Sequence, residues 1–350
     1  MPPLITPIIL SGGSGTRLWP MSTPDKPKQF IPLLSQHSMF LETISRVIDP
    51  KRFLTPIVVA ARRHSDLIAT EGFNGKVIFE PFPRGTAAAI ALAALEVGGG
   101  DELILVLSSD HAINNLDAFL LAIDGAASAA RKGWLVCLGV EPTRPETGYG
   151  YIRLGARIDN GPIKKVDSFV EKPTLELAQS YIEAGNYVWN AGIFLFRADA
   201  ILDALSSFSP ELYRLVVSSS NNAERKEQIV LPQPGAFETI TSGSIDTVVM
   251  ERAENVASIS VDMGWSDVGS WDSLYEMSKK SPHGNVIIGN VAMQNCSNVM
   301  VRSESIPIAI HGVSDLIVIA TNKGILIVPH GQTQEVKNLA EILGDNNEST

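Results

Sequence analysis

A short apolar run that leads directly into a Gly/Ser-rich loop constrains this chain more than any other stretch. Ile8-Ile9-Leu10 is too short to cross a membrane and is typical of a buried parallel strand. The loop that follows reads Ser11-Gly12-Gly13-Ser14-Gly15-Thr16-Arg17. Its glycines allow close approach of the backbone, its successive amides form an anion-binding concavity, and Arg17 adds a fixed charge. The pattern predicts a phosphate-binding loop at the carboxyl end of a first strand, with an ordinary strand-to-loop turn as the alternative.

Two familiar phosphate-binding motifs do not fit this loop. A Walker loop requires Gly-Lys-Ser/Thr at its end, where the chain has Gly15-Thr16-Arg17. A dinucleotide fingerprint that begins at Gly13 requires a third glycine at the position of Leu18. The loop therefore predicts phosphate binding of another kind.

Composition limits the classes of partner. The chain has 350 residues, 45% of them hydrophobic, and a formal net charge of −10, which argues against a nucleic-acid-binding protein. It has no basic leader and no apolar window long enough for a membrane span, and Cys137 and Cys296 are predicted to be buried free thiols. We expect a cytoplasmic protein that binds neither nucleic acid nor membranes, with any positive field for phosphates supplied by a few local cations.

The order of apolar runs predicts the architecture. Strand-like runs at 7–11, 56–60, 76–79, 103–107 and 134–138 alternate with helical patterns at 85–97 and 116–130. Further strands are expected at 164–170, 189–196 and 258–261, with a helix from Thr174. We predict an α/β domain over 1–280, Rossmann-like, with a mixed and mostly parallel sheet.

After Lys280 the helical periodicity disappears. Short apolar runs at 286–288, 298–301, 307–310, 315–319 and 325–328 are separated by Gly and Asn, which predicts a small solenoid or barrel-like β domain over 281–340. Residues 344–350 are polar, and residues 341–350 are expected to form a flexible tail. Because a solenoid leaves an end or edge to cover, we expect a homodimer formed through the C-terminal β domain.

Three charged side chains stand where phosphate and metal chemistry is expected. Lys28 lies between prolines and is presented at a restricted angle, which favours phosphate contact over a solvated loop. Asp110 follows the very apolar run 103–107, the position at which open α/β sheets place ligand groups, and a carboxylate there suits Mg²⁺. Asp267 lies between glycines and would complete a metal site together with Asp110; a helix cap is the alternative for Asp110.

Two further regions carry candidate substrate contacts. Glu80 ends a strand, and its carboxylate suits the two donors of guanine, whereas Thr86 is explained by a helix cap. Gly148-Tyr149-Gly150 permits backbone approach to a sugar, although a tight turn explains the same letters. In a strand, the neighbours Glu171 and Lys172 would face opposite ways, and Asn190 would recognise hydroxyls; an exposed charged strand edge is the alternative.

Together these motifs resemble the bacterial mannose-1-phosphate guanylyltransferases, within the sugar-nucleotide pyrophosphorylase family. The resemblance runs from Pro7 to about Lys337. It rests on these segments: Leu10 to Pro20, Pro27 to Phe30, Thr147 to Ile152, Phe169 to Pro173, Trp189-Asn190 with Gly192, Ser244 to Asp246, and Trp265 to Trp271.

The resemblance implies transfer of GMP from GTP to mannose 1-phosphate, giving GDP-mannose and pyrophosphate, with Mg²⁺ as cofactor. It implies a left-handed β-helix at the C-terminus. By position, Arg17 and Lys28 would hold the triphosphate, and Asp110 and Asp267 would hold Mg²⁺. The remaining implied nucleotide contacts are Ser11, Gly12, Gly13, Ser14, Gly15, Thr16, Glu80, Arg84, Gly85, Thr86 and Ser109. The implied sugar-phosphate contacts are Gly148, Tyr149, Gly150, Glu171, Lys172 and Asn190.

The chain departs from the family pattern at a few positions. Gly85 replaces an asparagine, which removes a side-chain contact to base or ribose, and Ala191 replaces a serine. Some relatives carry a fused isomerase domain, and we expect no isomerase activity from this chain. Two alternatives stay open: the same chemistry with another nucleotide or hexose 1-phosphate, and a regulatory subunit that binds nucleotide sugars without catalysis.

Overall fold

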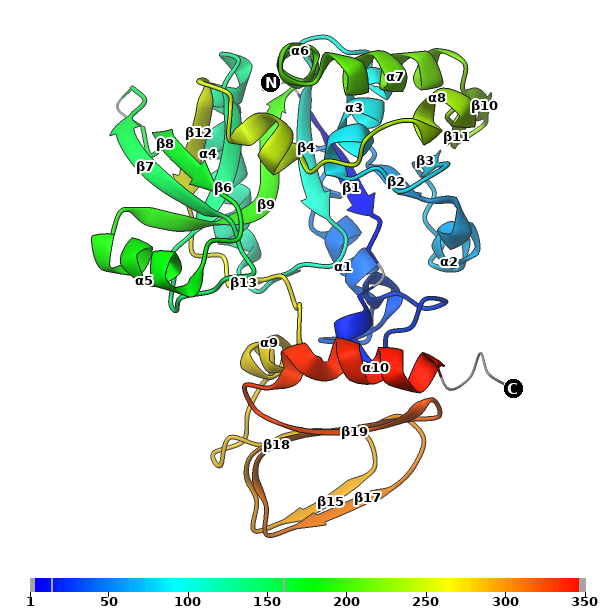
Figure 1. Cartoon of the computed structure of the whole chain (residues 1–350), viewed down its shortest axis with the longest axis vertical. Helices are drawn as coiled ribbons and strands as arrows, with labels where there is room; N and C mark the ends of the chain where they lie inside the picture. Colours follow the sequence, from blue (N-terminus) through cyan, green and yellow to red (C-terminus); the bar gives the residue numbers. More distant parts are fainter. Residues whose placement is uncertain (1–3, 14, 160, 346–350) are drawn as a thin grey trace. The chain divides into compact units, whose positions relative to one another are not determined.

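The computed structural model describes residues 4–13, 15–159 and 161–345, and the chain forms two compact units (Figure 1). The first unit contains residues up to Gly12, Thr43–Ser109 and Ile113–Trp265. The second contains Gly13–Glu42, Asp110–Ala112 and the chain from Ser266 onward. The chain passes between the units after Gly12, after Ser109, and within α1 (Met39–Ser45), β5 (Ala112–Ile113) and β13 (Trp265–Ser266). Each unit is described by itself.

The first unit is built on an eleven-stranded sheet in the order β10-β11-β3-β2-β1-β4-β9-β6-β12-β8-β7. In that order the strands are Glu224–Lys226, Ile229–Leu231, Lys76–Glu80, Ile57–Ala61, Ile5–Ser11, Leu103–Ser108, Tyr187–Arg197, Leu135–Val140, Val256–Ser260, Lys164–Val170 and Tyr151–Arg157. The sequence predicted most of these strands to within a few residues. It did not indicate the hairpin β10–β11 or strand β7.

The sheet is mixed, as predicted, but it is not mostly parallel: the parallel pairs lie in the half around β1 and between β6 and β12, and the other pairs are antiparallel. Strand β1 pairs in parallel with β2 and β4, with Ile8 opposite both Ile57 and Val106. Strand β9 then runs antiparallel to both β4 and β6, and β8 and β7 are also antiparallel to their neighbours. Strands β3, β2, β1 and β4 therefore end at one edge of the sheet, the edge where open α/β sheets hold ligands.

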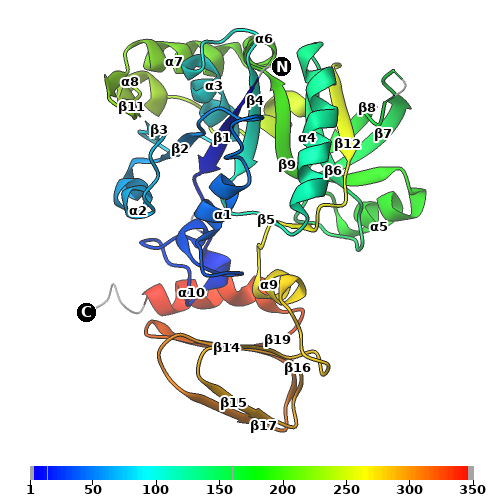
Figure 2. The same cartoon turned by 180° about the vertical axis from the view of Figure 1, so that it is seen from behind.

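Helices cover both faces of this sheet (Figures 1 and 2). Their bounds are α2 Ser65–Thr70, α3 Thr86–Glu96, α4 Leu116–Arg131, α5 Leu175–Ala184, α6 Ala198–Phe208, α7 Pro210–Asn221 and α8 Pro234–Glu238. Helix α3 is rich in alanine and buried from 87 to 94, and it packs with α6 and α7 on the face that carries Ile8 and Val106. Helix α4 lies against the opposite face, burying Phe119 and Ile123.

The second unit contains the predicted β-helix. Its strands are β14 Val286–Ile288, β15 Val291–Gln294, β16 Ser297–Ser303, β17 Ile308–His311, β18 Ser314–Thr321 and β19 Gly324–Pro329. Met300 lies in parallel register with Val286 on one side and Ile317 on the other, and β15 pairs in parallel with β17, so the chain coils. Strand β19 is antiparallel to β18 and closes the last coil.

Residues from the start of the chain pack on this β-helix. Val299 and Val301 of β16 point into the coil, whereas Met300 packs in a cluster with Leu18 and with Trp271 of α9 (Trp271–Met277). The buried guanidinium of Arg302 donates to the main-chain oxygens of Leu33 (2.9 Å) and Pro32 (2.6 Å). The predicted boundary at 280 therefore does not describe the units, because residues 13–42 and 266–280 pack with the C-terminal strands.

The prediction of a tail without helix was wrong for residues up to 345. Helix α10 spans Val336–Asp345, anchored by the fully buried Val336. Its other apolar residues, Leu339, Ile342 and Leu343, are 43%, 61% and 48% exposed. They recur at helical spacing, a signal that the sequence carried. Residues 346–350 of the predicted tail lie outside the described residues.

Candidate functional site

The predicted phosphate loop has the backbone that its glycines suggest. The 3₁₀ turn Thr16–Leu18 carries Arg17, and Gly15 before it has a left-handed φ of 62°. A Cβ at Gly15 would lie 2.5 Å from the Cβ of Lys28, so only glycine fits where the loop packs on that lysine. Gly12 is the last loop residue that belongs to the first unit. The main-chain oxygen of Gly13 accepts a hydrogen bond from the Gln29 side chain at 3.2 Å. Ser14 lies outside the described residues.

Lys28 joins the two predicted metal ligands. Its Nζ lies 3.0 Å from Oδ2 of Asp110 and donates to the main-chain oxygen of Asp267 at 2.7 Å. It also donates to the main-chain oxygen of Val268 at 3.3 Å, and the residue is only 6% exposed. These oxygens occupy the three donors of the ammonium group. Lys28 therefore anchors both aspartate segments in this structure, and a phosphate would have to replace one of these partners.

Asp110, Asp267, Arg17 and Lys28 all line one cavity of about 350 Å³ in the second unit. Burial disfavours the charged form of Asp110, but the charges of Lys28 and His111 outweigh it, and the pKa of Asp110 is lowered from its ordinary value. Oδ1 of Asp267 accepts a hydrogen bond from the Gly269 amide (3.0 Å). The described residues show no cluster of three or more metal-ligating side chains. Two carboxylates are nevertheless a sufficient protein contribution to a Mg²⁺ ion that substrate phosphates also hold.

The segment that carries Asp267 is conformationally strained. Val268 has a φ of 47°, which is unfavourable for a β-branched residue, and its side chain is fully buried. Its amide donates to Oγ of Ser266 at 3.0 Å, and its carbonyl is one of the partners of Lys28. Strained residues of this kind concentrate at functional sites, so the observation supports a role for the neighbouring carboxylate.

The same cavity includes a cation that the sequence reasoning missed. Lys337, on α10, lines it beside Arg17, and its Nζ lies 3.5 Å from the carboxylate of Glu341. Because no helix was expected there, nothing suggested that a residue so near the end of the chain would reach the phosphate loop. The helical spacing of the apolar residues around Lys337 was the available signal.

Three of the predicted nucleotide contacts lie at the carboxyl edge of the parallel strands in the first unit. Ser11 ends β1, Ser109 follows β4 and donates its amide to the main-chain oxygen of Leu10 (2.9 Å), and Glu80 ends β3. Burial raises the pKa of Glu80 to about 8. Oε1 of Glu80 and Oγ of Ser11 are both buried, and neither atom has a hydrogen-bond partner among the described residues. Two unsatisfied polar atoms at the ligand-binding edge of a sheet are consistent with a polar ligand.

The segment Arg84-Gly85-Thr86 has structural partners instead. The Arg84 guanidinium donates to the main-chain oxygens of Phe237 and Glu238 at the end of α8. Gly85 has a φ of 83°, and a Cβ there would lie 2.3 Å from the oxygen of Gly243, so a side chain at this position would displace the Gly243 backbone. The Thr86 hydroxyl accepts a hydrogen bond from the amide of Ile245 (2.8 Å). The Thr86 hydroxyl and the Ala87 amide, which donates to the Gly243 oxygen, hold the 243–245 segment against the start of α3. Thr86 does not cap the helix as predicted, because Gly85 is the N-cap residue.

The prediction that Glu171 and Lys172 face opposite ways was wrong. Strand β8 ends at Val170, and Lys172 has a left-handed φ of 48°, so strand alternation does not apply. Their side chains form an ion pair, with Nζ of Lys172 3.3 Å from Oε1 of Glu171. A Cβ at Gly150 would lie 2.6 Å from Oε2 of Glu171, so the glycine leaves room for this carboxylate.

The turn that precedes β7 carries the other glycine of this group and an aromatic ring. Gly148 donates its amide to Oε1 of Glu146 at 3.0 Å. The ring of Tyr149 lies edge-on to Trp189 and Trp265, with centroids 5.2 and 5.1 Å apart. Packing explains the position of the Tyr149 ring, and backbone approach to a sugar at Gly148 stays a prediction.

Asn190 is held by an aspartate to which the sequence reasoning assigned no role. Nδ2 of Asn190 donates to Oδ1 of Asp246 at 2.8 Å, and Oδ1 of Asn190 accepts the Gly192 amide at 3.1 Å. Burial, together with the negative charge of Glu171, raises the pKa of Asp246 to about 6. Asp246 begins a π-helical turn, Asp246–Met250, a feature common at functional sites. The motif Ser244 to Asp246 was noticed, but its partner became visible only in the fold.

Comparison with known proteins gives consistent results. A family model described as nucleotidyl transferase matches residues 6–283, and one described as MannoseP isomerase/GMP-like beta-helix domain matches residues 289–343. The xanthan biosynthesis protein XanB of Xanthomonas campestris pv. campestris (strain B100) is 42% identical over 342 residues, which cover 96% of this chain and 72% of that protein. A mannose-1-phosphate guanylyltransferase of Salmonella montevideo is 40% identical over 348 residues, covering 97% of this chain and 74% of that protein.

A solved structure shares the architecture of both units. It is described as a mannose-1-phosphate geranyltransferase from Thermus thermophilus, with a TM-score of 0.86 and 30% sequence identity. The match covers 97% of this chain and 99% of that one. Cys137 and Cys296 are buried free thiols, as predicted, and none of the helices in the described ranges is long and apolar enough to cross a bilayer.

Proposed function

We propose, from the premise that this chain belongs to the nucleotidyl transferase family and to its mannose-1-phosphate guanylyltransferases, that it transfers GMP from GTP to α-D-mannose 1-phosphate. The products are GDP-mannose and pyrophosphate. The observation that carries the proposal is the cavity in which Lys28 links Asp110 to the Asp267 segment beside Arg17. A protein that only bound a nucleotide sugar would not need two carboxylates organised around one buried ammonium group.

The reaction needs positioning and charge neutralisation more than a protein nucleophile. Mannose 1-phosphate is largely dianionic near neutral pH, since the second pKa of a phosphate is about 6. One of its oxygens attacks the α-phosphorus of GTP in line, the new P–O bond forms, and the bond to the pyrophosphate oxygen breaks. The obstacles are repulsion between two anions and the charge that grows on the leaving pyrophosphate. No covalent enzyme intermediate is required.

The cations of the second unit neutralise the negative charge that develops on the leaving pyrophosphate. Arg17, always charged and with forked donors, holds the triphosphate and then the pyrophosphate. Lys28 keeps Asp110 ionised and fixes the Asp267 backbone, so its principal contribution is to position both carboxylates. Mg²⁺ is proposed as the cofactor; when held by Asp110 and Asp267 it would neutralise phosphate charge and polarise the reacting phosphorus.

The first unit supplies the residues for recognition of the two substrates. Glu80 accepts hydrogen bonds from N1–H and the exocyclic amine of guanine, which would satisfy its buried unpaired oxygen. Asn190, oriented by Asp246, donates to and accepts from sugar hydroxyls, and the Glu171 carboxylate accepts from them. Lys172 contacts the sugar phosphate. Arg84 and Thr86 act indirectly, by holding the backbone of the segment that contains Gly85.

One assay tests the reaction and its specificity together. Pyrophosphate release is measured with GTP, ATP, UTP and dTTP, each against mannose 1-phosphate, glucose 1-phosphate and galactose 1-phosphate, with and without Mg²⁺. Fastest release with GTP and mannose 1-phosphate supports the proposal. Faster release with another pair supports the alternative substrates, and release with none supports a regulatory binding subunit. GTP made chiral at the α-phosphorus should give product with inverted configuration, as a single in-line displacement requires.

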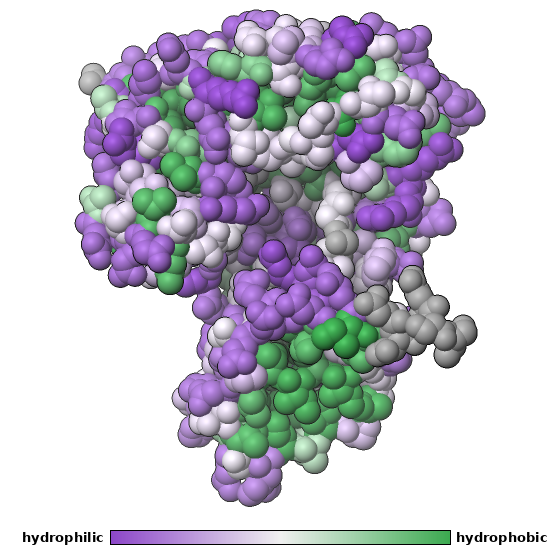
Figure 3. Space-filling view, viewed as in Figure 1, coloured by the Kyte–Doolittle hydropathy of each residue, from purple (hydrophilic) through white to green (hydrophobic). Residues whose placement is uncertain are grey.

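We also propose a homodimer, formed through the C-terminal β domain, in the cytoplasm. Ile325 and Ile327 of the terminal strand β19 are 55% and 65% exposed, and Figure 3 shows an apolar area on this domain. Exposed apolar patches on a terminal strand favour association. Light scattering should give the mass of two chains, and Ile327→Lys should give that of one. Two free thiols and cytosolic substrates are the basis for the proposed compartment.

A further inference from the structure

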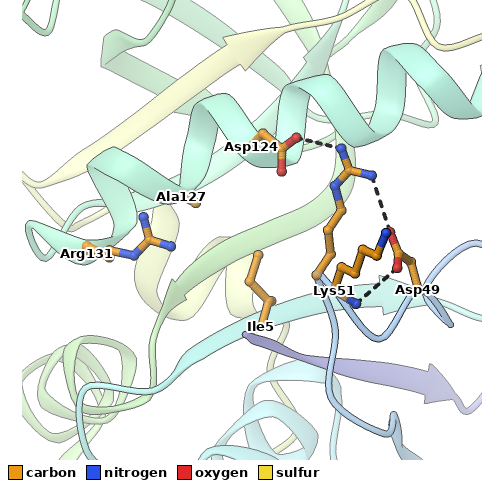
Figure 4. A pocket seen from close by; sticks show the side chains of 7 residues that line it. Ile5, Asp49, Lys51, Asp124, Ala127 and Arg131 are labelled. Carbon is orange, nitrogen blue, oxygen red and sulfur yellow. Dashed lines mark hydrogen bonds and ion pairs between the residues drawn. The ribbon is translucent and has the colours of Figure 1, made fainter. Parts of the chain in front are cut away.

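A second cavity lies in the first unit, at the opposite end of β1 from the phosphate loop. It has a volume of about 480 Å³, within the range of small-molecule sites, and its floor includes the buried Ile5 and Ala127 (Figure 4). Ile5 begins β1 and Ser11 ends it, a separation of roughly 20 Å for an extended strand of this length. None of the residues assigned above to the reaction lines this cavity.

One arginine uses both carboxylates of the cavity. Nη2 of Arg52 lies 3.0 Å from Oδ2 of Asp124, on α4, and its Nη1 lies 3.6 Å from Oδ2 of Asp49. The backbone of Arg52 is fixed as well, because its carbonyl accepts the Ile5 amide at 2.9 Å. Oδ1 of Asp49 also accepts the main-chain amide of Lys51 at 3.0 Å. Each carboxylate has about four acceptor positions, so both retain positions for a ligand.

Two other cations of the cavity have no acidic partner among the described residues. Lys51 and Arg131 line it, and neither side chain forms an ion pair there. Nε of Arg131 is buried without a hydrogen-bond partner in the described part of the chain. Figure 4 shows Arg131 on one side of Ile5 and Lys51 on the other. In a chain with a net charge of −10, two unpaired cations around one hollow form an unusual local positive site.

We propose that this cavity binds a phosphate ester with a hydroxylated body, the size of a hexose phosphate or a mononucleotide. Lys51 and Arg131 neutralise the phosphate, which satisfies the buried Nε of Arg131. Hydroxyls of the ligand donate to Asp49 and Asp124, and its apolar edge lies on Ile5 and Ala127. The site is separate from the substrate sites, and strand β1 connects its floor to Ser11, so it is suited to an effector.

Binding of mannose 6-phosphate and of GMP to the whole chain, measured by calorimetry, tests the site. Lys51→Gln and Arg131→Gln should each weaken binding of mannose 6-phosphate or GMP, whichever binds here, by about tenfold. Lys51→Arg and Arg131→Lys keep the positive charge and should retain most of the affinity. Lys226→Gln and Arg214→Gln, at exposed positions, are the matched controls. Arg17→Gln, which alters the phosphate loop, should leave this binding intact. Hydrogen exchange should slow at residues 50–54 and 124–131 when the ester is bound.

Several results would overturn the proposal. One is the absence of binding at millimolar concentrations of either ester. Another is binding that Arg17→Gln abolishes and the cavity variants leave unchanged, which would assign it to the substrate site. Inorganic phosphate bound as tightly as the esters would remove the role given to Asp49 and Asp124. Thermal melting of each variant establishes that it is folded before its binding is compared.

Discussion

Substitution of Glu80 by glutamine should stabilise the free protein while it weakens the proposed guanine site. In the folded chain, burial raises the pKa of Glu80 from an ordinary value of 4.5 to about 8. The native state therefore holds a proton on Glu80 between these two pH values, where the unfolded chain releases it. Stability of the wild type should fall as the pH rises through this window and level off above pH 8.

The size of the effect follows from the two pKa values. Titration of Glu80 lowers the free energy of unfolding, relative to a side chain that does not titrate, by about 1 kcal/mol at pH 5, about 3 kcal/mol at pH 7 and about 5 kcal/mol at pH 8.5. Glutamine has nearly the same shape and carries no charge. Its own burial adds a cost that does not depend on pH, so the difference between variant and wild type should widen by about 4 kcal/mol from pH 5 to pH 8.5.

Urea unfolding followed by tryptophan fluorescence measures this difference at each pH. Glu183→Gln, at an exposed position on α5, is the control, and its difference from wild type should stay flat. A Glu80→Gln difference that is constant within about 1 kcal/mol across the range would refute the assigned burial of Glu80.

Guanine binding gives an independent readout of the same group. Two guanine donors require the ionised carboxylate, so the apparent affinity for GTP should rise about tenfold between pH 7 and pH 9 in the wild type. In Glu80→Gln the NH2 group of the amide would face a donor of guanine and could not accept its hydrogen bond, so GTP should bind about 100-fold more weakly. An unchanged GTP affinity in the variant would remove Glu80 from the base site.

Further substitutions test the other assignments. Asp110→Asn and Asp267→Asn should each lower kcat by about 100-fold or more and shift the Mg²⁺ concentration required, whereas Asp262→Asn should not; near-normal turnover would exclude that residue from the metal site. Lys172→Ala should raise KM for mannose 1-phosphate about tenfold with a smaller change for GTP, and an unchanged KM would contradict the sugar-phosphate role. Lys337→Gln should weaken pyrophosphate inhibition about threefold to tenfold if its ammonium group acts on the triphosphate, and an unaltered inhibition constant would show that it does not.

Much of the fold was accessible from the sequence because its strands are strongly apolar and local. The runs that became β1, β4 and β6 are continuous and bounded by turn residues, and the helical face of α4 repeats at regular spacing. The hairpin β10–β11 was missed because its first strand, Glu224–Lys226, is entirely charged and pairs only at the edge of the sheet. Helix α10 was missed although its apolar residues recur at helical spacing, because it follows a long β region.

The candidate site was predictable as a set of residue types but not as a set of contacts. Arg17, Lys28, Asp110 and Asp267 were identified because charged residues follow apolar strands or lie among Gly and Pro. The contacts of Lys28 with the two aspartate segments could be seen only in the folded structure, because both partners lie more than 80 residues away in the sequence. Asp246 became part of the site only through its contact with Asn190.

The sequence by itself indicated most strands of the first unit and the change to short β-strands after residue 280, because periodicity and turn residues act over short distances along the chain. Tertiary structure decided which unit each segment joins, which cations are saturated by protein oxygens and which carboxyls have a raised pKa. Those outcomes depend on burial and on contacts between residues far apart in sequence. The predicted phosphate loop packs with the C-terminal strands, and burial raises the pKa of Glu80, for reasons that no local pattern contains.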